Sequence, residues 1–315
     1  MVAATPLLLL VSAALIHCHS SLDSGQQLLQ LGVTTHSHMS FNATRAEMAQ
    51  LARGFRVVRT DLRWNLVQPK GTGHSYDWSL YDGLLARLAA NEIVPLLILD
   101  RPPIGGAPST PSAAASFAQF AVDAVRRYRG RGVLFELWNE PDINDYSTLA
   151  KPNATAYATL AHAVCAALHR AGLDNETIIG PALAGDDAGF DPGIDYAFLE
   201  QLFSASPGGV PTCFDAISVH PYQQGPPEQV LHSYTRLRTL LTRYGAARLP
   251  VVCSEWGYST CRHPCQTKEL HATTEEMQAR YLLRSWLCNA ASGVAISVFC
   301  ERAFTHACAL LGLQV

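Results

Sequence analysis

The sequence predicts an α/β fold, a (β/α)8 TIM barrel, from two observations. Short, mostly apolar runs rich in β-branched residues alternate with long amphipathic segments, which is the order of βα units around a parallel sheet. Eight such runs and seven helical segments follow one another in strict alternation, which favours a closed barrel over an open doubly wound sheet. Such a barrel takes about 250 residues, and the chain has 315. One domain, residues 24–315, is therefore expected after a short leader.

The predicted strands are apolar almost throughout, as strands covered on both faces should be. Neither a GxGxxG motif after the first strand nor a P-loop is present, so nucleotide binding has no support. The eight strands are predicted at 31–35, 57–61, 94–99, 134–138, 177–181, 216–220, 250–254 and 293–299.

The helical segments begin at residues suited to capping. Thr44-x-x-Glu47 and Thr273-x-x-Glu276 are predicted capping boxes for the first and last helices, and Ser79 is a predicted cap for the second. Only a short tail follows the eighth strand, so the eighth βα unit is expected to be incomplete. The helices are predicted at 44–54, 79–91, 112–128, 154–171, 195–204, 227–244 and 273–291.

The N-terminus is typical of an export signal. Pro6 to Ile16 form a nearly pure apolar run, which is shorter than the roughly 20 residues that span a bilayer. We expect residues 1–20 to be a signal peptide that is cleaved near Cys18 to Ser21, giving a secreted protein with no membrane attachment. A buried helix or an uncleaved anchor is the alternative, because no positive charges precede the run.

Other bulk features agree with export. Three sequons, at Asn42, Asn153 and Asn175, could carry glycans in a secretory pathway. The net charge of −3 disfavours a nucleic-acid partner, which would select a strongly basic surface. We expect a monomer that needs no cofactor.

Eight cysteines remain after loss of the leader, and an even number in an exported chain permits disulfides. Cys261 and Cys265 are the nearest pair in sequence. A zinc site that includes His263 and His271 is the competing interpretation, although no second closely spaced Cys/His pair follows.

Polar residues gather after the predicted strands, where the active sites of such barrels lie. Glu140 follows the fourth strand and Glu255 the seventh. Cleavage of a glycosidic bond needs two such carboxyl groups, one protonated to assist the leaving oxygen and one charged. Glu136 falls within a strand and is interpreted as structural.

Four segments carry a resemblance to a known group of enzymes. FELWNEPD (135–142) and VVCSEWGYST (251–260) resemble the two signatures of glycoside hydrolase clan A, which includes families five and thirty-nine. VVRTDLRWNLVQP (57–69) resembles the second βα unit of those families, and FDAISVHPY (214–222) their sixth strand. The resemblance implies a retaining glycosidase on a (β/α)8 barrel, which cleaves O-glycosidic, most typically β, linkages of an oligo- or polysaccharide.

The resemblance also implies roles for individual residues. Glu140 matches the acid/base and Glu255 the nucleophile. Asn139 matches the amide that binds the sugar 2-hydroxyl. Arg59 matches the arginine that keeps the nucleophile ionised, since a nearby cation lowers the pKa of a carboxylate.

Other residues are expected to bind substrate. His220 and Tyr222 resemble the residues that lie beside the nucleophile after the sixth strand. Trp256 is expected to stack on a sugar face, with ordinary core packing as the alternative. His36, at the end of the first strand, is expected to line the floor of the same site.

Two other functions remain open at this stage. The short segment after the eighth strand leaves a catalytically inactive or truncated carbohydrate-binding barrel as an alternative. A metal-dependent hydrolase is weakly supported, because no His-Glu-x-x-His spacing is present and only His36 and His38 come near a His-x-His ligand pair. The sugar, the linkage and the endo or exo mode depend on loop shape, since one fold hosts many specificities.

Overall fold

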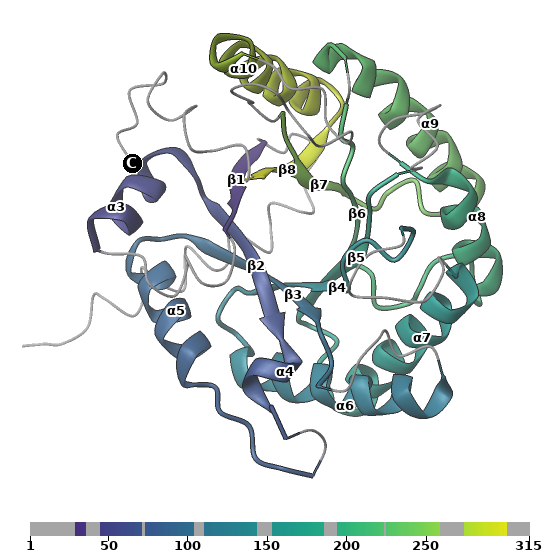
Figure 1. Ribbon diagram of the computed structural model, residues 1–315. Coiled ribbons are helices and arrows are strands. Elements are labelled where there is room, and N and C mark those ends of the chain that lie inside the picture. The colour runs from purple at the N-terminus through teal and green to yellow at the C-terminus, as the bar shows by residue number, and fades with distance from the viewer. Residues whose placement is uncertain are drawn as a thin grey trace, which may run out of the picture.

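A computed structural model describes residues 29–35, 45–70, 73–103, 110–143, 153–185, 194–223, 225–258 and 274–300. Eight parallel strands close into a barrel in the order β1 to β8, and helices surround it (Figure 1). The predicted TIM barrel is confirmed. Several predicted features lie outside the described residues: the signal peptide, His36, the Cys261–Cys265 segment and the tail after Cys300.

The predicted strands are confirmed, with ends that differ by one or two residues at most. Such differences are within the usual uncertainty of element boundaries. The strands are β1 Gln30–Thr34, β2 Val57–Arg63, β3 Val94–Asp100, β4 Leu134–Leu137, β5 Thr177–Leu183, β6 Ala216–Val219, β7 Val251–Trp256 and β8 Val294–Cys300.

The eighth strand closes the barrel through a regular parallel ladder with the first. Gln30 pairs with Ile296 and Thr34 with Cys300, while on its other edge Thr34 pairs with Arg59 of β2. The strands therefore bring their carboxyl ends to a single rim, which is the condition for one shared site.

The predicted helices are confirmed, with two additions. A single turn, α4, follows β2, and the sixth predicted helix divides into a 3-10 turn and an α-helix. The described helices are α3 Arg45–Gly54, α4 Trp64–Val67, α5 Ser79–Ala90, α6 Pro111–Tyr128, α7 Ala154–Arg170, α8 Tyr196–Ala205, η1 Pro227–Gln229, α9 Val230–Arg243 and α10 Glu275–Ala291.

The capping residues differ from two of the predictions. Ser79 lies inside α5, and its backbone N–H donates to the Asp77 carboxylate. Thr274 caps α10 by accepting a hydrogen bond from Met277 N–H, so the predicted box at Thr273 is wrong. Each cap satisfies a backbone donor that the first turn leaves without an internal partner.

Apolar packing forms two clusters. The large one fills the space between strands and helices, where for example Trp64 stacks on Phe120 at 5.2 Å between ring centroids. The small one lies inside the barrel and contains residues from seven of the strands. Its members are Val57, Leu96, Leu134, Ile179, Ala216, Val252, Ala295, Ile296 and Val298.

One disulfide, Cys165–Cys213, joins α7 to the segment before β6. The expectation of disulfides is thus confirmed for this pair. Pairing of Cys261 with Cys265, which lie outside the described residues, stays a prediction. Cys253 and Cys288 are buried thiols. Within the described residues, every helix is too short or too polar to cross a lipid bilayer.

Candidate active site

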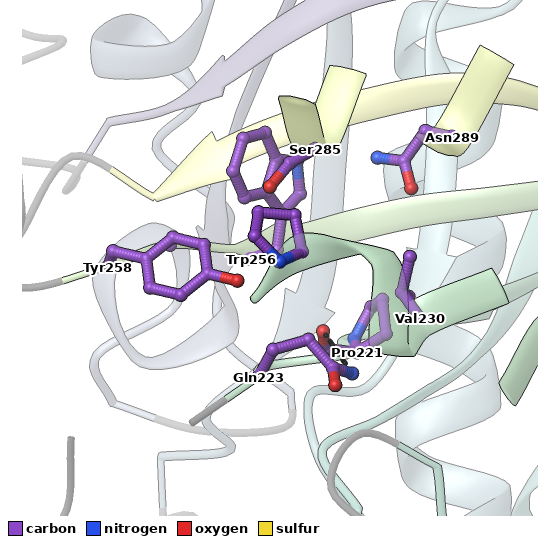
Figure 2. A pocket seen from close by; sticks show the side chains of 9 residues that line it. Pro221, Gln223, Val230, Trp256, Tyr258, Ser285 and Asn289 are labelled. Carbon is purple, nitrogen blue, oxygen red and sulfur yellow. Dashed lines mark hydrogen bonds between the residues drawn. The ribbon is translucent and has the colours of Figure 1, made fainter. Parts of the chain in front are cut away.

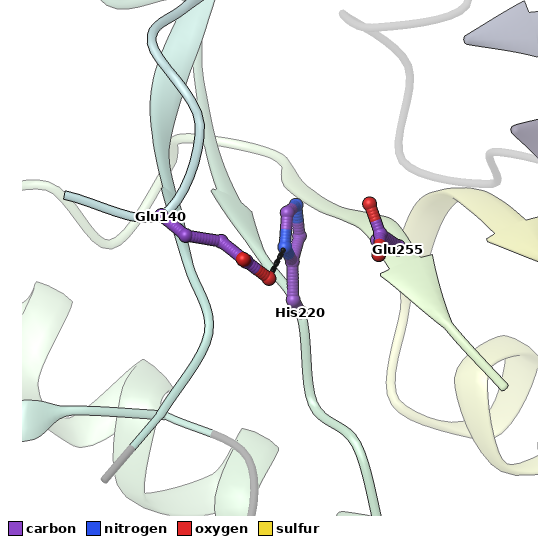
Figure 3. A group of neighbouring side chains, drawn as sticks. All are labelled: Glu140, His220 and Glu255. Carbon is purple, nitrogen blue, oxygen red and sulfur yellow. Dashed lines mark hydrogen bonds and ion pairs between the residues drawn. The ribbon is translucent and has the colours of Figure 1, made fainter. Parts of the chain in front are cut away.

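Three side chains meet at the carboxyl ends of β4, β6 and β7. One oxygen of Glu140, one oxygen of Glu255 and one ring nitrogen of His220 all lie within 4.8 Å of one another. Figure 3 shows the imidazole of His220 between the two carboxylates. The two carboxylates are 14% and 17% exposed, so both are largely buried but not sealed from solvent.

Glu255 is held by two donors. Arg59 Nη1 donates to Oε2 at 2.6 Å, and the Tyr222 hydroxyl donates to Oε1 at 2.5 Å. Burial raises the pKa of Glu255, but the positive charge of Arg59 and the hydrogen bonds from Tyr222 and Arg59 lower it by more, so that the pKa lies below its usual range. Glu255 is therefore a carboxylate throughout the neutral range, as a nucleophile must be.

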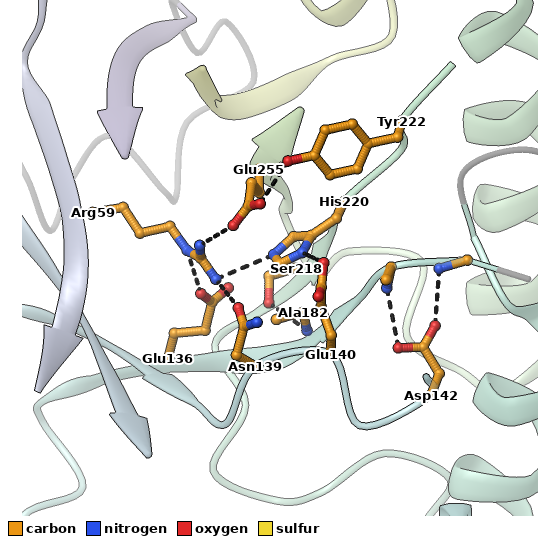
Figure 4. A network of polar contacts seen from close by, with 12 residues as sticks. Arg59, Glu136, Asn139, Glu140, Asp142, Ala182, Ser218, His220, Tyr222 and Glu255 are labelled. Carbon is orange, nitrogen blue, oxygen red and sulfur yellow. Dashed lines mark hydrogen bonds and ion pairs between the residues drawn. The ribbon is translucent and has the colours of Figure 1, made fainter. Parts of the chain in front are cut away.

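Arg59 is the centre of the polar network in Figure 4. Its side chain is 1% exposed, and Nε donates to Glu136 Oε2 at 2.7 Å while Nη2 donates to Asn139 Oδ1 at 2.6 Å. Burial lowers the pKa of Arg59, but the charges of Glu136 and Glu255 raise it by more. One fixed cation on β2 thus contacts groups from β4, from the residues that follow β4 and β6, and from β7.

The contacts of His220 define which nitrogen carries its proton. Nε2 lies 3.2 Å from Arg59 Nη2, and Nδ1 lies 2.8 Å from Glu140 Oε1. Arginine only donates hydrogen bonds, so Nε2 must accept. The neutral ring then has its hydrogen on Nδ1 and donates it to Oε1 of Glu140.

The segment that carries Glu140 has unusual backbone geometry. Trp138 and Glu140 have φ angles of 70° and 47°, in the left-handed region that side chains other than glycine seldom adopt. The Glu140 N–H donates to the carbonyl of Ala182 at 3.1 Å. Strained residues of this kind persist where surrounding contacts hold them, and they cluster at functional sites.

Asp142 anchors the same segment to the residues that follow β5. Its two carboxylate oxygens accept hydrogen bonds from the backbone N–H groups of Ala184 and Gly185 at 3.0 and 2.9 Å. Burial raises the pKa of Asp142 to about 7, against the effect of these two hydrogen bonds, and the charge of Glu140 adds to the increase.

Trp256 lies beside the site and is packed away from solvent. Its ring is 4% exposed, its Nε1 donates to Ser297 Oγ at 2.9 Å, and it makes edge contacts with Trp286 and Phe299. It lines a small hollow together with Tyr258 (Figure 2). This is the core packing named above as the alternative, and contact of Trp256 with a sugar stays a prediction.

Comparison with known structures identifies the same architecture in glycoside hydrolases. The barrel matches a family 39 glycoside hydrolase from the gut symbiont Bacteroides cellulosilyticus WH2 with a TM-score of 0.64 and 21% identity over 86% of this chain. It matches a GH5-4 broad specificity endoglucanase from Clostridium acetobutylicum with a TM-score of 0.61 and 13% identity over 87% of this chain. A bacterial orthologue of human α-L-iduronidase matches with a TM-score of 0.62 and 18% identity over 86% of this chain.

The chain shares the TIM-barrel fold of these glycoside hydrolases. It covers 56% of the family 39 structure, 48% of the iduronidase orthologue and 88% of the endoglucanase, so it spans about half the length of two of the three. No family model and no curated sequence matches it. The likeness is therefore one of fold, and it agrees with the families that the motifs resemble.

The structure brings six of the eight predicted site residues into one network and places a seventh beside it. Arg59, Asn139, Glu140, His220, Tyr222 and Glu255 form one network, and Trp256 lies directly after Glu255 on β7. His36 lies outside the described residues.

Sequence reasoning missed the part played by two other acids. Glu136 contacts Arg59, and Asp142 anchors the segment of Glu140. A signal for Glu136 existed, because side chains along a strand alternate between faces. Leu134 faces the barrel interior, so Glu136, two residues later, faces it as well.

A metal ion could be held geometrically by Glu140, His220 and Glu255. The local charge disfavours this, because Glu255 already pairs with the Arg59 cation at 2.6 Å. Both nitrogens of His220 are also engaged, one as an acceptor from arginine and one as a donor to Glu140. The arrangement suits proton transfer and nucleophilic attack better than ligation of a cation.

Proposed function

We propose that the protein is a retaining glycosidase that cleaves β-linked O-glycosides by double displacement, with Glu140 as acid/base and Glu255 as nucleophile. The observation that carries the proposal is that one carboxylate oxygen of Glu140 lies within 4.8 Å of one carboxylate oxygen of Glu255. Retaining enzymes place these groups about 5–5.5 Å apart, whereas inverting enzymes need about 6.5–9.5 Å to admit a water molecule.

In the first step, a Glu255 carboxylate oxygen attacks the anomeric carbon. The bond from that carbon to the leaving oxygen breaks, and Glu140 transfers its proton to this oxygen. The product is a glycosyl ester of Glu255 and a free alcohol. The low pKa of Glu255 keeps the attacking oxygen charged. Because Oε1 of Glu140 accepts the hydrogen bond from His220, Oε2 is the proposed oxygen that carries the proton.

In the second step, Glu140 is a carboxylate and accepts a proton from water as the water oxygen attacks the anomeric carbon. The ester bond breaks, and Glu255 is released as a carboxylate. Two inversions at one carbon give net retention. Loss of the Glu255 charge in the intermediate favours the ionised form of Glu140, because a neighbouring negative charge is removed.

Asn139 is placed to form a hydrogen bond with the substrate. Its Oδ1 accepts a hydrogen bond from Arg59, which fixes the amide so that Nδ2 is free to donate. A sugar 2-hydroxyl is the proposed acceptor, and such a contact strengthens as the oxocarbenium-like state forms. His36 and Trp256 are proposed to complete the substrate site.

The proposed substrate is an oligo- or polysaccharide, and the proposed setting is extracellular. A monomeric glycoprotein, secreted after removal of residues 1–20, agrees with the apolar leader, the sequons and the disulfide. The endoglucanase and the iduronidase orthologue differ in substrate by their names, so the sugar must be found by experiment.

The test is a hydrolysis screen of aryl β-glycosides and β-glucans with wild type and two variants. Glu140→Gln and Glu255→Gln should each lower kcat/KM by at least about a thousandfold without loss of fold. Glu200→Gln, which removes an exposed carboxylate paired with Arg243, is the matched control and should be silent. Proton NMR of the first product should show retained anomeric configuration.

Two results would count against the proposal. Inverted product would exclude double displacement. Sugar binding by calorimetry without turnover, in a well-folded wild type, would instead support the alternative of an inactive carbohydrate-binding barrel.

A further inference from the structure

Glu136 is a fully buried carboxylate at the centre of the barrel. Its side chain is 0% exposed, and Oε2 accepts a hydrogen bond from Arg59 Nε at 2.7 Å (Figure 4). Its other oxygen, Oε1, meets no hydrogen-bond donor within the described residues. The negative charge of Glu136 is therefore balanced by Arg59.

This contact crosses the interior of the barrel. Arg59 belongs to β2 and Glu136 to β4, and β3 lies between these strands in the sheet. One step lower on the same strands, Val57 and Leu134 belong to the apolar cluster inside the barrel. A buried ion pair commonly adds no more stability than apolar residues of similar volume, so packing alone gives no reason for an acid at this position.

Arg59 contacts each partner through a different nitrogen. Nε faces Glu136, Nη1 faces Glu255, and Nη2 faces both Asn139 and His220. The guanidinium group is planar, so a contact at the Nε edge fixes the direction of the other two nitrogens. The same contact places a second negative charge on the cation that stabilises Glu255.

We propose that Glu136 is a positioning residue, which shares the Arg59 cation with Glu255 and so limits how strongly that cation stabilises the nucleophile. The inference rests on the proposed function, in which Glu255 attacks the sugar. It assigns to a residue outside the catalytic pair control over the balance between the two chemical steps.

The two steps should respond in opposite directions. Glu255 loses its charge when the glycosyl ester forms and regains it when the ester is hydrolysed. If residue 136 had no charge, Arg59 would stabilise the free Glu255 carboxylate more strongly than it does in wild type. Formation of the ester should then slow, because its transition state loses that stabilisation. Hydrolysis of the ester should be unchanged or faster.

Glu136→Gln tests this, because glutamine keeps an oxygen that can accept from Arg59 Nε and removes the charge. The probe is the 2,4-dinitrophenyl 2-deoxy-2-fluoro form of the β-glycoside that wild type hydrolyses fastest. Trapping of the variant should be slower by roughly tenfold, about the effect of one pKa unit, and release of the trapped sugar should be no slower than in wild type. Equal slowing of both steps would mean general distortion and would overturn the proposal.

Tyr157→Phe provides the matched control. The Tyr157 hydroxyl donates to the carbonyl of Leu137 at 2.8 Å, so this change removes a buried contact to the same strand without touching Arg59. Both rates should stay at the wild-type value. A shift of the control in the same pattern as Glu136→Gln would also overturn the proposal.

A second measurement does not need activity. If Arg59 is shared, removal of one carboxylate leaves the cation with a partner, and removal of both leaves it buried and uncompensated. The Glu136→Gln/Glu255→Gln double variant should therefore lose more stability to urea than the two single variants together. Tyr157→Phe/Glu255→Gln should be additive.

The kinetic and stability measurements distinguish failure of the proposed function from failure of the shared cation. A wild type without turnover but with the expected coupling would overturn the proposed function and retain the shared cation. Additive behaviour of the Glu136 and Glu255 variants would overturn the sharing even in an active enzyme. Should Glu136→Gln not fold, Glu136→Met takes its place because it also removes the charge, and its coupling with Glu255→Gln must have the same sign.

Discussion

The lower and upper parts of the barrel interior are built from the same strands and differ completely in chemistry. Val57, Leu134, Ala216 and Val252 form part of the apolar cluster in the lower part. Two residues further along each of those strands stand Arg59, Glu136, Ser218 and Ser254, all of them buried. Successive inward positions of a strand are two residues apart, so the change from apolar to polar takes one step.

The contrast indicates how the fold separates stability from chemistry. The lower part contributes apolar burial, which closes the barrel without any directional requirement. The upper part buries charges and hydroxyls, which lower stability unless each meets a partner. Arg59 and its four contacts meet that condition, so the polar part is a network whose members depend on one another.

A charge placed in the lower part should have the largest effect. Val252 is 0% exposed and packed among apolar neighbours, so Val252→Asp would bury a carboxylate without a cation. We expect the free energy of unfolding to fall by about 5 kcal/mol or more, measured by urea denaturation. Val252→Ala, which only removes volume, should lose about 2 kcal/mol. Equal losses would mean that the lower part tolerates charge.

Removal of the cation from the upper part should cause the second-largest loss of stability. Arg59→Met keeps the length of the side chain and leaves Glu136 and Glu255 without their shared partner. We expect a loss of about 3–5 kcal/mol at pH 7, because each carboxylate would be buried unpaired. The loss should shrink at pH 4, where the carboxylates can take up protons. A variant as stable as wild type at pH 7 would mean that the network is not held by Arg59.

The sequence predicted the fold well because the fold depends on repeated patterns. Apolar runs of β-branched residues and amphipathic segments gave all eight strands and the helices that follow them. The turn α4 was not predicted, because it spans only Trp64–Val67 and is too short to show a helical period in the sequence. The cap at Thr274 was missed because neighbouring threonines offered equivalent candidates.

The site was predicted in part, for a different reason. Motif resemblance located Glu140 and Glu255, and the shared rim of the barrel made their meeting a consequence of fold. Partnerships across the barrel, such as Arg59 with Glu136, join positions 77 residues apart and follow no local spacing. The anchoring of Asp142 on backbone amides that follow β5 is likewise invisible in sequence, because any residue other than proline could supply those amides.

Asp142 extends the comparison to pH. The folded protein holds its proton more tightly than an unfolded chain, since its pKa is about 7 against 3.8. Its contribution to stability is therefore full below about pH 4 and is lost as the pH rises to 7. Relative to Asp142→Asn, wild type should lose about 2–4 kcal/mol between pH 4 and pH 8, from about 1.4 kcal/mol per pKa unit.

Leu134→Ala is the control for this titration, because it alters the lower part of the barrel and adds no titratable group. Its loss of stability should be the same at every pH between 4 and 8. If the difference between wild type and Asp142→Asn were equally flat, the Asp142 carboxyl would have an ordinary pKa in the folded protein.

The smallest effect should come from a hydroxyl that the network does not use. Ser254 is fully buried, and its Oγ has no hydrogen-bond partner within the described residues. Ser254→Ala should leave the free energy of unfolding unchanged or raise it by up to about 1 kcal/mol, because an unpaired polar atom is removed. Ser218→Ala, one strand away, should lower it by about 1–2 kcal/mol, since Ser218 Oγ accepts from Ala182 N–H at 2.9 Å. Equal losses for the two serines, measured side by side in urea, would mean that Ser254 is bonded too, and that the upper part is satisfied throughout.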